Sequence, residues 1–331
     1  MVITSKKLMN GVQMSRFGRV DALMFRQDLP KPEPASGQVR VRVMASSLNP
    51  LDQATWEGRL KALRVRRPPL IPGSDVSGVI DQTGPGVLDW QVGDDVYGFL
   101  DAAPKRQWHG FTQSGAWAEY AVTRAETLTR KPDTLSFEEA AAVPVAGLTA
   151  LQGLNRAALS AGHTILINGA SGGVGSLAVQ LAVSRGLIVY ATSSPQHHAT
   201  LKRLGVHRVI DYHQLPVSQS PTGLDAVYDV ANRLSWAQKC ARIHQRGSVI
   251  DNLVSLRGGW HRLMGGRSPS GVRHRYTFVT PDAAALYQLS ELVTAGKLRP
   301  QVARSFQLQT FQEAYRWLAT EKPFGKVILT L

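Results

Sequence analysis

The chain of 331 residues has one cysteine, Cys240, and no apolar run long enough to cross a membrane. A single cysteine excludes an internal disulfide and any zinc site built from several cysteines. A membrane-spanning helix needs about 20 apolar residues, so we expect no membrane insertion. The stretch Met1–Phe17 has two lysines but lacks the apolar core of a secretory signal. These absences favour a reducing, cytoplasmic compartment.

Acidic residues are scarce beside basic ones, with 24 Asp and Glu against 38 Lys and Arg, which leaves a net charge of +14. Such an excess favours anionic ligands or surfaces. The segment Leu256–Arg275 is rich in glycine and arginine and has no acidic residue. It is either a solvated loop or a loop that faces an anion or a partner.

Two parts of the chain differ in pattern. Gln38–Ala45 alternates valine with polar residues, as in a half-buried strand, and short segments bounded by glycine and proline follow. This first part is expected to be β-rich. The pattern changes near Lys131–Asp133, after which Ser136 is placed to cap a helix. With 43% hydrophobic and 19% charged residues, a chain of this length fits two globular domains.

Strands and helices alternate in the second part, which implies an α/β fold with a parallel sheet covered on both faces. The expected strands are Thr164–Asn168, Leu187–Thr192, Arg208–Asp211, Ala226–Asp229 and Ser248–Asp251. Beyond Gln301 the pattern changes again. There we expect a short strand, an amphipathic helix at Phe311–Ala319 and a closing strand at Lys326–Leu331.

A glycine-rich turn follows the strand Thr164–Asn168 and opens a helix. In the dinucleotide fingerprint G-x-G-x-x-G, Ala170 takes the first position, and Gly172 and Gly175 take the second and third. The second glycine lets a pyrophosphate approach the backbone, and the third lets helix and strand pack closely. The N-terminus of the helix attracts the phosphates. A tight turn that merely needs glycine does not account for this order of strand, turn and helix. We therefore assign dinucleotide binding to Ala170, Ser171, Gly172, Gly173, Val174 and Gly175.

The end of the next strand indicates which dinucleotide binds. NAD sites usually carry Asp or Glu there, which accepts from the ribose 2′-OH. This strand ends in Ser193 and Ser194, and no carboxylate follows before Asp211. The serines and His197 can donate to a 2′-phosphate, so we expect NADPH as the cofactor. His197 and His198 also fit an exposed helix start.

Several short motifs accompany the turn, and they span nearly the whole chain: Ser47–Asp52, Pro72–Gly78, Gly93–Gly98, Gly115–Tyr120, Ala142–Pro144, Gly147–Ala150 and Gly325–Lys326. In this order the chain resembles the zinc-independent medium-chain dehydrogenase/reductases, the quinone oxidoreductase-like branch. The resemblance implies a Rossmann fold, a doubly wound parallel sheet that binds NADPH, at residues 134–300. It also implies a GroES-like β-rich catalytic domain made of residues 1–133 and 301–331, with the cofactor in the cleft.

Metal-dependent relatives need Cys, His and Glu ligands. This chain has Asn49 where a cysteine would be expected and Gly73–Asp75 where Gly-His-Glu would stand, while Cys240 lies far away in an expected helix. We therefore expect no metal. The remaining chemistry is hydride transfer from NADPH to a quinone or an α,β-unsaturated carbonyl compound, with donors for the charge on the carbonyl oxygen.

The match places Asn49 and Asp52 beside the nicotinamide as the expected catalytic residues. Asn49 would donate its amide N–H to the substrate carbonyl or help to fix the ring. Asp52 would take part in the reaction, or it simply caps a helix. Ala54 stands where some members of the family carry a tyrosine, and His197 where the family often has a lysine.

Four more residues are expected to contact the cofactor by the same match. Thr149, at a helix start, would bond the nicotinamide side, or it bonds its own backbone. Tyr212 would pack on the adenosine end. Asn252 would line the nicotinamide ribose, and Lys326 would approach from the C-terminal segment.

The leading interpretation is an NADPH-dependent reductase of a small-molecule quinone or enone. A homodimer is the family expectation, through a strand near Tyr276–Val279. The alternative is a nucleic-acid or anionic-surface binding protein that keeps the fold, motivated by the net charge and by Arg64, Arg66 and Arg67. No basic motif with interleaved aromatics and no RNA-binding signature supports that alternative.

Overall fold

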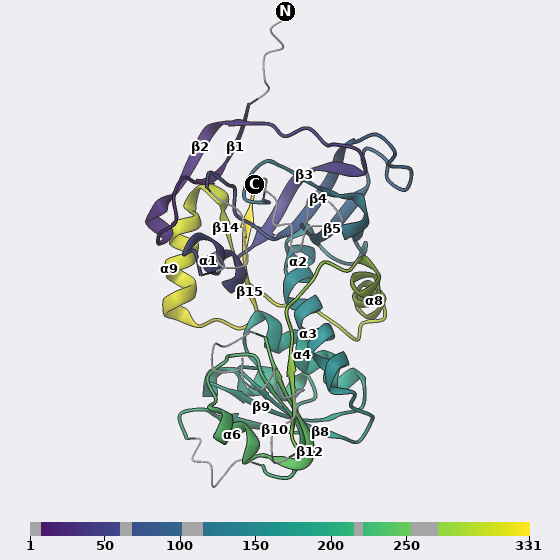
Figure 1. Cartoon of the computed structure of the whole chain (residues 1–331), viewed down its shortest axis with the longest axis vertical. Helices are drawn as coiled ribbons and strands as arrows, with labels where there is room; N and C mark the ends of the chain where they lie inside the picture. Colours follow the sequence, from purple (N-terminus) through teal and green to yellow (C-terminus); the bar gives the residue numbers. More distant parts are fainter. Residues whose placement is uncertain (1–7, 60–67, 101–114, 215–220, 253–270) are drawn as a thin grey trace, which may run out of the picture.

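Two large β-sheets organise the chain, one in each half of the molecule (Figure 1). The structure is a computed structural model that describes residues 8–59, 68–100, 115–214, 221–252 and 271–331. The purple and yellow ends of the chain share the upper half, and much of the teal and green middle forms the lower half (Figure 1). The first and last described segments therefore fold together.

The lower sheet has six described strands in the order β10-β9-β8-β11-β12-β13, and all neighbours run parallel. Their bounds are β8 (Thr164–Asn168), β9 (Ile188–Ser193), β10 (Arg208–Asp211), β11 (Leu224–Asp229), β12 (Ile243–Asp251) and β13 (Arg273–Tyr276). The expected strands of this part are confirmed. Apolar side chains such as Ile165 and Ile167 of β8 are fully buried because helices cover the sheet.

The helices of this middle part include one whose start the sequence predicts. Ser136 caps α2 in a capping box with Glu139, which confirms the expected cap. The helices are α2 (Phe137–Ala141), α3 (Pro144–Ala157), α4 (Gly173–Ser184), α5 (His198–Arg203), α6 (Trp236–Cys240) and α8 (Ala283–Thr294). No helix in the described ranges is both long and apolar enough to span a bilayer.

The upper sheet is mostly antiparallel and has the order β14-β15-β3-β4-β5-β7, with β6 paired to β3. Its strands are β3 (Gln38–Ser47), β4 (Asp75–Thr83), β5 (Asp95–Phe99), β6 (Tyr120–Arg124), β7 (Leu128–Arg130), β14 (Val302–Gln307) and β15 (Lys326–Thr330). The hairpin β1 (Leu8–Met14) and β2 (Leu23–Pro30) and the helices α1 (Pro50–Trp56) and α9 (Phe311–Glu321) complete this half. Short 3₁₀ turns are η1 (Val20–Ala22), η3 (Ala125–Thr127), η4 (Pro195–His197) and η7 (Leu308–Thr310).

The structure corrects two expectations about the last strand of the parallel sheet. The strand is Arg273–Tyr276 rather than Tyr276–Val279, and Arg273–Arg275 belong to it rather than to a loop. Buried His274 alternates with more exposed arginines, which is the period of a strand. The rest of the basic segment, residues 256–270, and Arg64, Arg66 and Arg67 lie outside the described residues.

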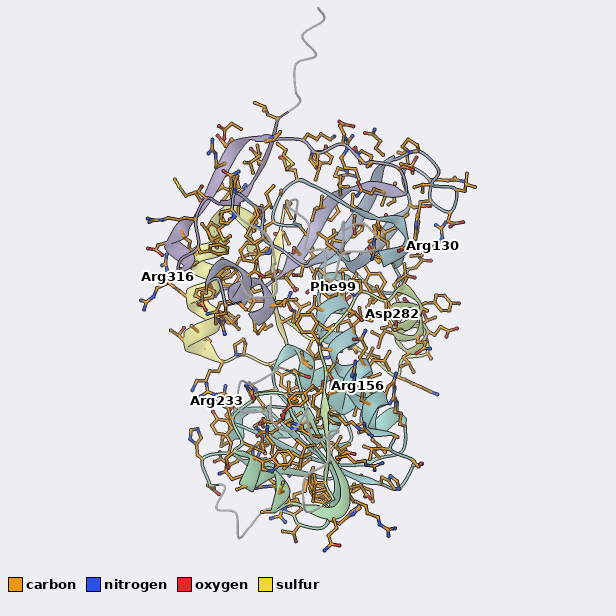
Figure 2. All side chains as sticks on the ribbon, in the orientation of Figure 1. Phe99, Arg130, Arg156, Arg233, Asp282 and Arg316 are labelled. Carbon is orange, nitrogen blue, oxygen red and sulfur yellow. The ribbon has the colours of Figure 1, made fainter. Side chains whose placement is uncertain are left out.

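Strand β5 joins the two halves. Tyr97 and Phe99 are buried in the same core as α3 and α8, and Phe99 lies in the middle of the molecule (Figure 2). The hydroxyl of Tyr97 lies 2.7 Å from that of Ser290 on α8. Because Tyr97 belongs to the upper sheet and Ser290 to helix α8, this contact helps to fix the position of the upper sheet on the lower half.

We expect Tyr97→Phe to lower the free energy of unfolding by about 1 kcal/mol, because it removes one buried hydrogen bond. Urea unfolding measures this change. Tyr287→Phe is the matched control, since Tyr287 is 56% exposed. Equal midpoints for both variants would contradict the role given to Tyr97.

Candidate coenzyme and substrate site

The glycine-rich turn joins β8 to α4 at the carboxyl end of the parallel sheet. Helix α4 starts at Gly173, with Gly172 at its N-cap and no side-chain cap. By contrast, the hydroxyls of Ser136 and Ser235 cap α2 and α6. The first N–H groups of α4 therefore have no capping side chain, and an anion is their natural partner.

The two fingerprint glycines have different reasons to be glycine. A Cβ at Gly175 would lie 2.1 Å from the carbonyl oxygen of Gly169, so the packing of α4 on β8 requires glycine there. A Cβ at Gly172 would meet no protein atom closer than 3.7 Å, and its φ of −72° suits any residue. The protein itself thus does not need glycine at Gly172. The space in front of it fits a ligand that approaches the backbone.

Some backbone groups of the other turn residues already form hydrogen bonds within the protein. The N–H of Ala170 donates to the carbonyl of Thr192 at 3.0 Å, so this amide is not available to a phosphate. The carbonyl of Ser171 accepts from the N–H of Gly325 at 2.8 Å. Ser171, Gly173 and Val174 are only half-buried. The amides that remain for a ligand are those at the start of α4.

The end of β9 lies beside the end of β10, where Ser193 is in register with Asp211. Tyr212 follows and is 42% exposed. Ser193 is buried and its hydroxyl donates to the carbonyl of Ser194 at 3.1 Å, whereas Ser194 itself is half-buried. Ser194 and Tyr212 are therefore the more accessible residues at this edge.

The structure differs from the expectation for His197. Its ring is buried, stacks on Phe324 with centroids 5.5 Å apart, and its Nε2 lies 3.1 Å from the carbonyl of Lys322. This histidine holds the C-terminal segment. It is neither the exposed helix start nor a free donor.

Tyr228 brings Thr149 and Asn252 together. Its hydroxyl lies 2.9 Å from the carbonyl of Thr149 and 2.7 Å from Oδ1 of Asn252. The expectation that Thr149 begins a helix is wrong, since α3 starts at Pro144. The Thr149 hydroxyl donates to the carbonyl of Val145 at 2.6 Å, which is the alternative of a helical threonine bonding its own backbone.

Lys326 links the turn to the upper half. Its aliphatic stem passes Gly173 so closely that a Cβ there would lie 2.4 Å from Lys326 Cδ. Its ammonium group is buried and donates to the carbonyl of Leu48 at 2.9 Å and to Oδ1 of Asn49 at 2.5 Å. It also lies 3.5 Å from the carboxylate of Asp75. Burial lowers the pKa of Lys326, and the carboxylates of Asp75 and Asp52 oppose that shift.

The amide of Asn49 is fully engaged within this cluster. Its Oδ1 accepts from Lys326, and its Nδ2 donates to Asp75 at 2.8 Å and to the hydroxyl of Ser47 at 3.3 Å. The hydroxyl of Ser47 donates to the same carboxylate, and the N–H of Val145 donates to it at 2.7 Å. Both N–H groups of Asn49 are thus bonded within the protein, and a direct role toward the substrate stays a prediction. The asparagine orients Lys326 and Asp75.

Asp52 lies in the first turn of α1, and the cap position belongs to Asn49, so the helix-cap alternative is wrong. Its Oδ1 accepts from the hydroxyl of Ser74 at 2.6 Å. Burial raises the pKa of Asp52 to about 6, and Asp75 adds to this shift while Ser74, Lys326 and Asn49 oppose it. Asp52 is thus a buried carboxyl group that exchanges its proton near neutrality.

Asp52 and Ser74 line a small pocket with a cavity volume of about 20 Å³. Its other lining residues are mostly apolar: Thr55, Trp56, Leu70, Ile71, Pro72, Gly73, Leu100 and Gly115. Such a cavity with few polar groups is typical of a small-molecule site. Because Asp75 follows Ser74 directly in the chain, the pocket adjoins the Lys326 cluster.

A second buried cluster lies at the carboxyl ends of β11 and β12. Lys239 Nζ is 3.0 Å from Asp229 and 2.6 Å from Asp251, and His274 Nε2 is 2.7 Å from Asp251. Burial would raise the pKa of Asp251, but the hydrogen bonds from His274 and Lys239 hold it below its ordinary value. The sequence did not predict this cluster. The one feature that pointed to it is that two of the expected strands both end in aspartate.

The sequence-derived residues fall into two groups. The turn, Ser194, Tyr212, Asn252 and Lys326 gather around the carboxyl edge of the sheet and the C-terminal segment that crosses it. Asn49 and Asp52 lie beyond Lys326 in the upper half. Within the described ranges, no three His, Cys, Asp or Glu side chains are grouped so as to hold a metal ion.

Comparisons with known proteins extend this picture. Models for an alcohol dehydrogenase GroES-like domain and a zinc-binding dehydrogenase match residues 35–133 and 204–329. The chain is 34% identical to the 2-methylene-furan-3-one reductase of Solanum lycopersicum over 317 residues, 95% of this chain and 76% of that protein. It is 33% identical to the chloroplastic NADPH-dependent alkenal/one oxidoreductase of Arabidopsis thaliana, over 95% of this chain and 78% of that one. The solved quinone oxidoreductase of Coxiella burnetii has a TM-score of 0.87 and 32% identity, covering 98% of this chain and 100% of that chain.

The two fingerprint glycines give a matched pair of variants. We expect Gly172→Ala to weaken dinucleotide binding about tenfold, or about 1.4 kcal/mol, with unchanged thermal stability, because its Cβ enters the ligand space. Gly175→Ala should lose about 1–3 kcal/mol of stability through overpacking. Titration calorimetry and thermal unfolding measure the two effects. Unchanged affinity in Gly172→Ala would refute the placement of the dinucleotide.

Proposed function

Because the chain is an oxidoreductase of the medium-chain dehydrogenase/reductase family, we propose that it reduces a quinone or an α,β-unsaturated carbonyl compound with NADPH and without a metal ion. The observation that carries this proposal is the series of contacts from Gly173, along Lys326, to Asn49 and to Asp75, the residue that follows Ser74 of the pocket. A relative at 33% identity is named an NADPH-dependent alkenal/one oxidoreductase.

The coenzyme would supply a hydride when bound. The amides at the start of α4 would hold its diphosphate, and Ser194 would donate to the 2′-phosphate, with the buried Ser193 behind it. Tyr212, exposed beside Ser194, would cover the adenosine end. Asn252 would face the nicotinamide ribose with its amide nitrogen, because its oxygen is held by Tyr228. Thr149 would support this side through its backbone carbonyl, which contacts the same tyrosine.

The donor set around Lys326 does not suit zinc. Zinc prefers thiolate, imidazole and carboxylate ligands, whereas this cluster offers one carboxylate, an amide and a hydroxyl around an ammonium that is already in place. The positive charge of Lys326 balances Asp75. We therefore propose that fixed protein charges and dipoles, rather than a Lewis acid, stabilise the charge that develops on the substrate.

The pocket defines what the protein side chains do for the substrate. Its apolar wall would bind the carbon skeleton and exclude water, which strengthens every electrostatic interaction inside. Asp52 and Ser74 are polar groups in this wall, so they would face the substrate carbonyl or the carbon next to it.

Two further proposals concern the assembly and its compartment. Strand β13 is the last described strand at one edge of the parallel sheet, and it would pair with a second copy of the chain in a homodimer. A cytoplasmic location stays a prediction from composition, and the Arabidopsis thaliana relative named above is chloroplastic.

The coenzyme preference is tested by Ser194→Asp. A carboxylate beside the 2′-phosphate should lower the ratio of NADPH to NADH affinity about tenfold, because juxtaposed like charges cost several kcal/mol. Ser305→Asp adds the same charge at an exposed position of β14 and should leave the ratio unchanged. An unchanged ratio in Ser194→Asp would place the 2′-phosphate elsewhere.

The reaction is tested by NADPH consumption with a panel of quinones and enones before and after exhaustive chelation. We expect turnover that survives chelation. Loss of activity that zinc restores would contradict the metal-free mechanism. Tight binding of an oligonucleotide at moderate salt, with no binding of either nicotinamide coenzyme, would instead favour the nucleic-acid alternative.

A further inference from the structure

The pocket wall contains a hydroxyl and a carboxyl group in direct contact. Ser74 Oγ donates to Asp52 Oδ1 at 2.6 Å, and both side chains line the pocket. They are 5% and 4% exposed, so bulk water has little access to either. The two groups therefore form a short chain along which a proton can pass to something bound in the pocket.

The second oxygen of Asp52 supports this interpretation. Among the described residues, Asp52 Oδ2 is buried and has no hydrogen-bond partner. A buried ionised carboxylate needs several donors, whereas a protonated carboxyl needs fewer and carries its own O–H. The groups that face Asp52 are Asn49 at the N-cap of its own helix, Ser74 just before β4, Asp75 at the start of β4, and Lys326 of β15. Within this surrounding, burial outweighs the donors and the pKa of Asp52 rises to about 6.

The apolar wall favours a proton supplied by the protein. Leu70, Ile71 and Leu100 are buried side chains that line the same cavity. A substrate that gains negative charge there has few water molecules from which to take a proton. An acid fixed in the wall supplies it at the right place.

We propose that Ser74 and Asp52 form the proton donor for reduction of a carbon–carbon double bond, and that α,β-unsaturated carbonyl compounds are the substrates for which this site is built. The inference rests on the proposed reductase function. Ser74 is the group that touches the substrate, and Asp52 recharges it. Nothing in the sequence analysis assigned a role to Ser74.

The steps balance as follows for an enone. Hydride adds to the β-carbon, a C–H bond forms, and the π electrons move to give an enolate. When Asp52 is protonated, its O–H donates to Ser74 Oγ and the Ser74 hydroxyl turns to the substrate. The proton of Ser74 then passes to the α-carbon, and the proton of Asp52 passes to Ser74 Oγ. The enone leaves as the saturated carbonyl compound, NADPH as NADP⁺, and the Asp52 carboxylate regains a proton from water.

The reduction of a quinone does not need a proton donor for carbon. Hydride transfer produces a hydroquinone anion whose charge lies on oxygen. This anion needs no proton on carbon, so it can leave the pocket and take its proton from bulk water. The Ser74–Asp52 pair should therefore matter for enones and much less for quinones. This difference separates a proton donor from a residue that merely keeps the site folded.

The experiment compares initial rates of Asp52→Asn and Ser74→Ala with an enone and a quinone, both with NADPH. We expect the enone rate to fall about 10²-fold, the lower end of general acid catalysis, and the quinone rate to stay within about threefold. Ser77→Ala is the matched control. Ser77 is buried in β4, three residues after Ser74, and its hydroxyl has no partner among the described residues, so both of its rates should stay at the wild-type level.

The pH dependence provides a second readout. The acid form of Asp52 is needed, so the wild-type enone rate should fall as pH rises through about 6, while the quinone rate stays flat. The same pKa predicts a stability effect that needs no coenzyme. The proton on folded Asp52 stabilises the protein fully below pH 3.8, and this contribution is lost as pH rises through about 6. The melting temperature of the wild type should therefore decline relative to Asp52→Asn over this range.

The outcomes separate this inference from the proposed function. A wild-type protein that reduces neither substrate refutes the reductase function itself. A wild type that reduces both, with equal losses for enone and quinone in Asp52→Asn, refutes only the proton donor. A melting-temperature difference that does not change between pH 4 and pH 7 also refutes it, because Asp52 then holds no proton near neutrality.

Discussion

The buried ammonium group of Lys326 connects the parts of the site. Its stem crosses the first turn of α4 at Gly173, and its charge ends between Asn49 and Asp75 in the other half of the molecule. An ammonium group in such a place is costly unless it is paired, and removing one partner of a buried pair typically costs about 3–5 kcal/mol. The positions of Asn49 and Asp75 therefore depend on the lysine. Through Val145, the same carboxylate holds the start of α3.

This arrangement places three functions in a row. The start of α4 offers bare amides and open space, the Lys326 cluster supplies a fixed and nearly neutral set of charges, and the apolar pocket holds Asp52 and Ser74. No part can take over the function of another, because an open turn cannot exclude water and an apolar pocket cannot bind a diphosphate. Strand β5, with Tyr97 and Phe99 in the core shared with α3 and α8, holds the two halves of the molecule in a fixed relative position. The chemistry proposed here follows from this contiguity rather than from any single residue.

The sequence predicts the parts that depend on local pattern. Apolar runs predict the strands of the parallel sheet, and the fingerprint predicts the turn, because both follow from residues close in the chain. The site itself depends on contacts between distant residues. The amide of Asn49 is oriented by Lys326, 277 residues away, and the sequence gives no sign of this contact. Ser74 gains significance only beside Asp52, and His274 only beside Asp251, which no spacing along the chain reveals.

A crystal structure of the protein with bound NADPH tests the central claim most directly. The account predicts the diphosphate over the amides at the start of α4, in the space before Gly172. It also predicts that the nicotinamide ring lies beside Lys326 and opens onto the pocket of Asp52 and Ser74. A coenzyme bound elsewhere, or a ring that faces away from that pocket, would contradict it.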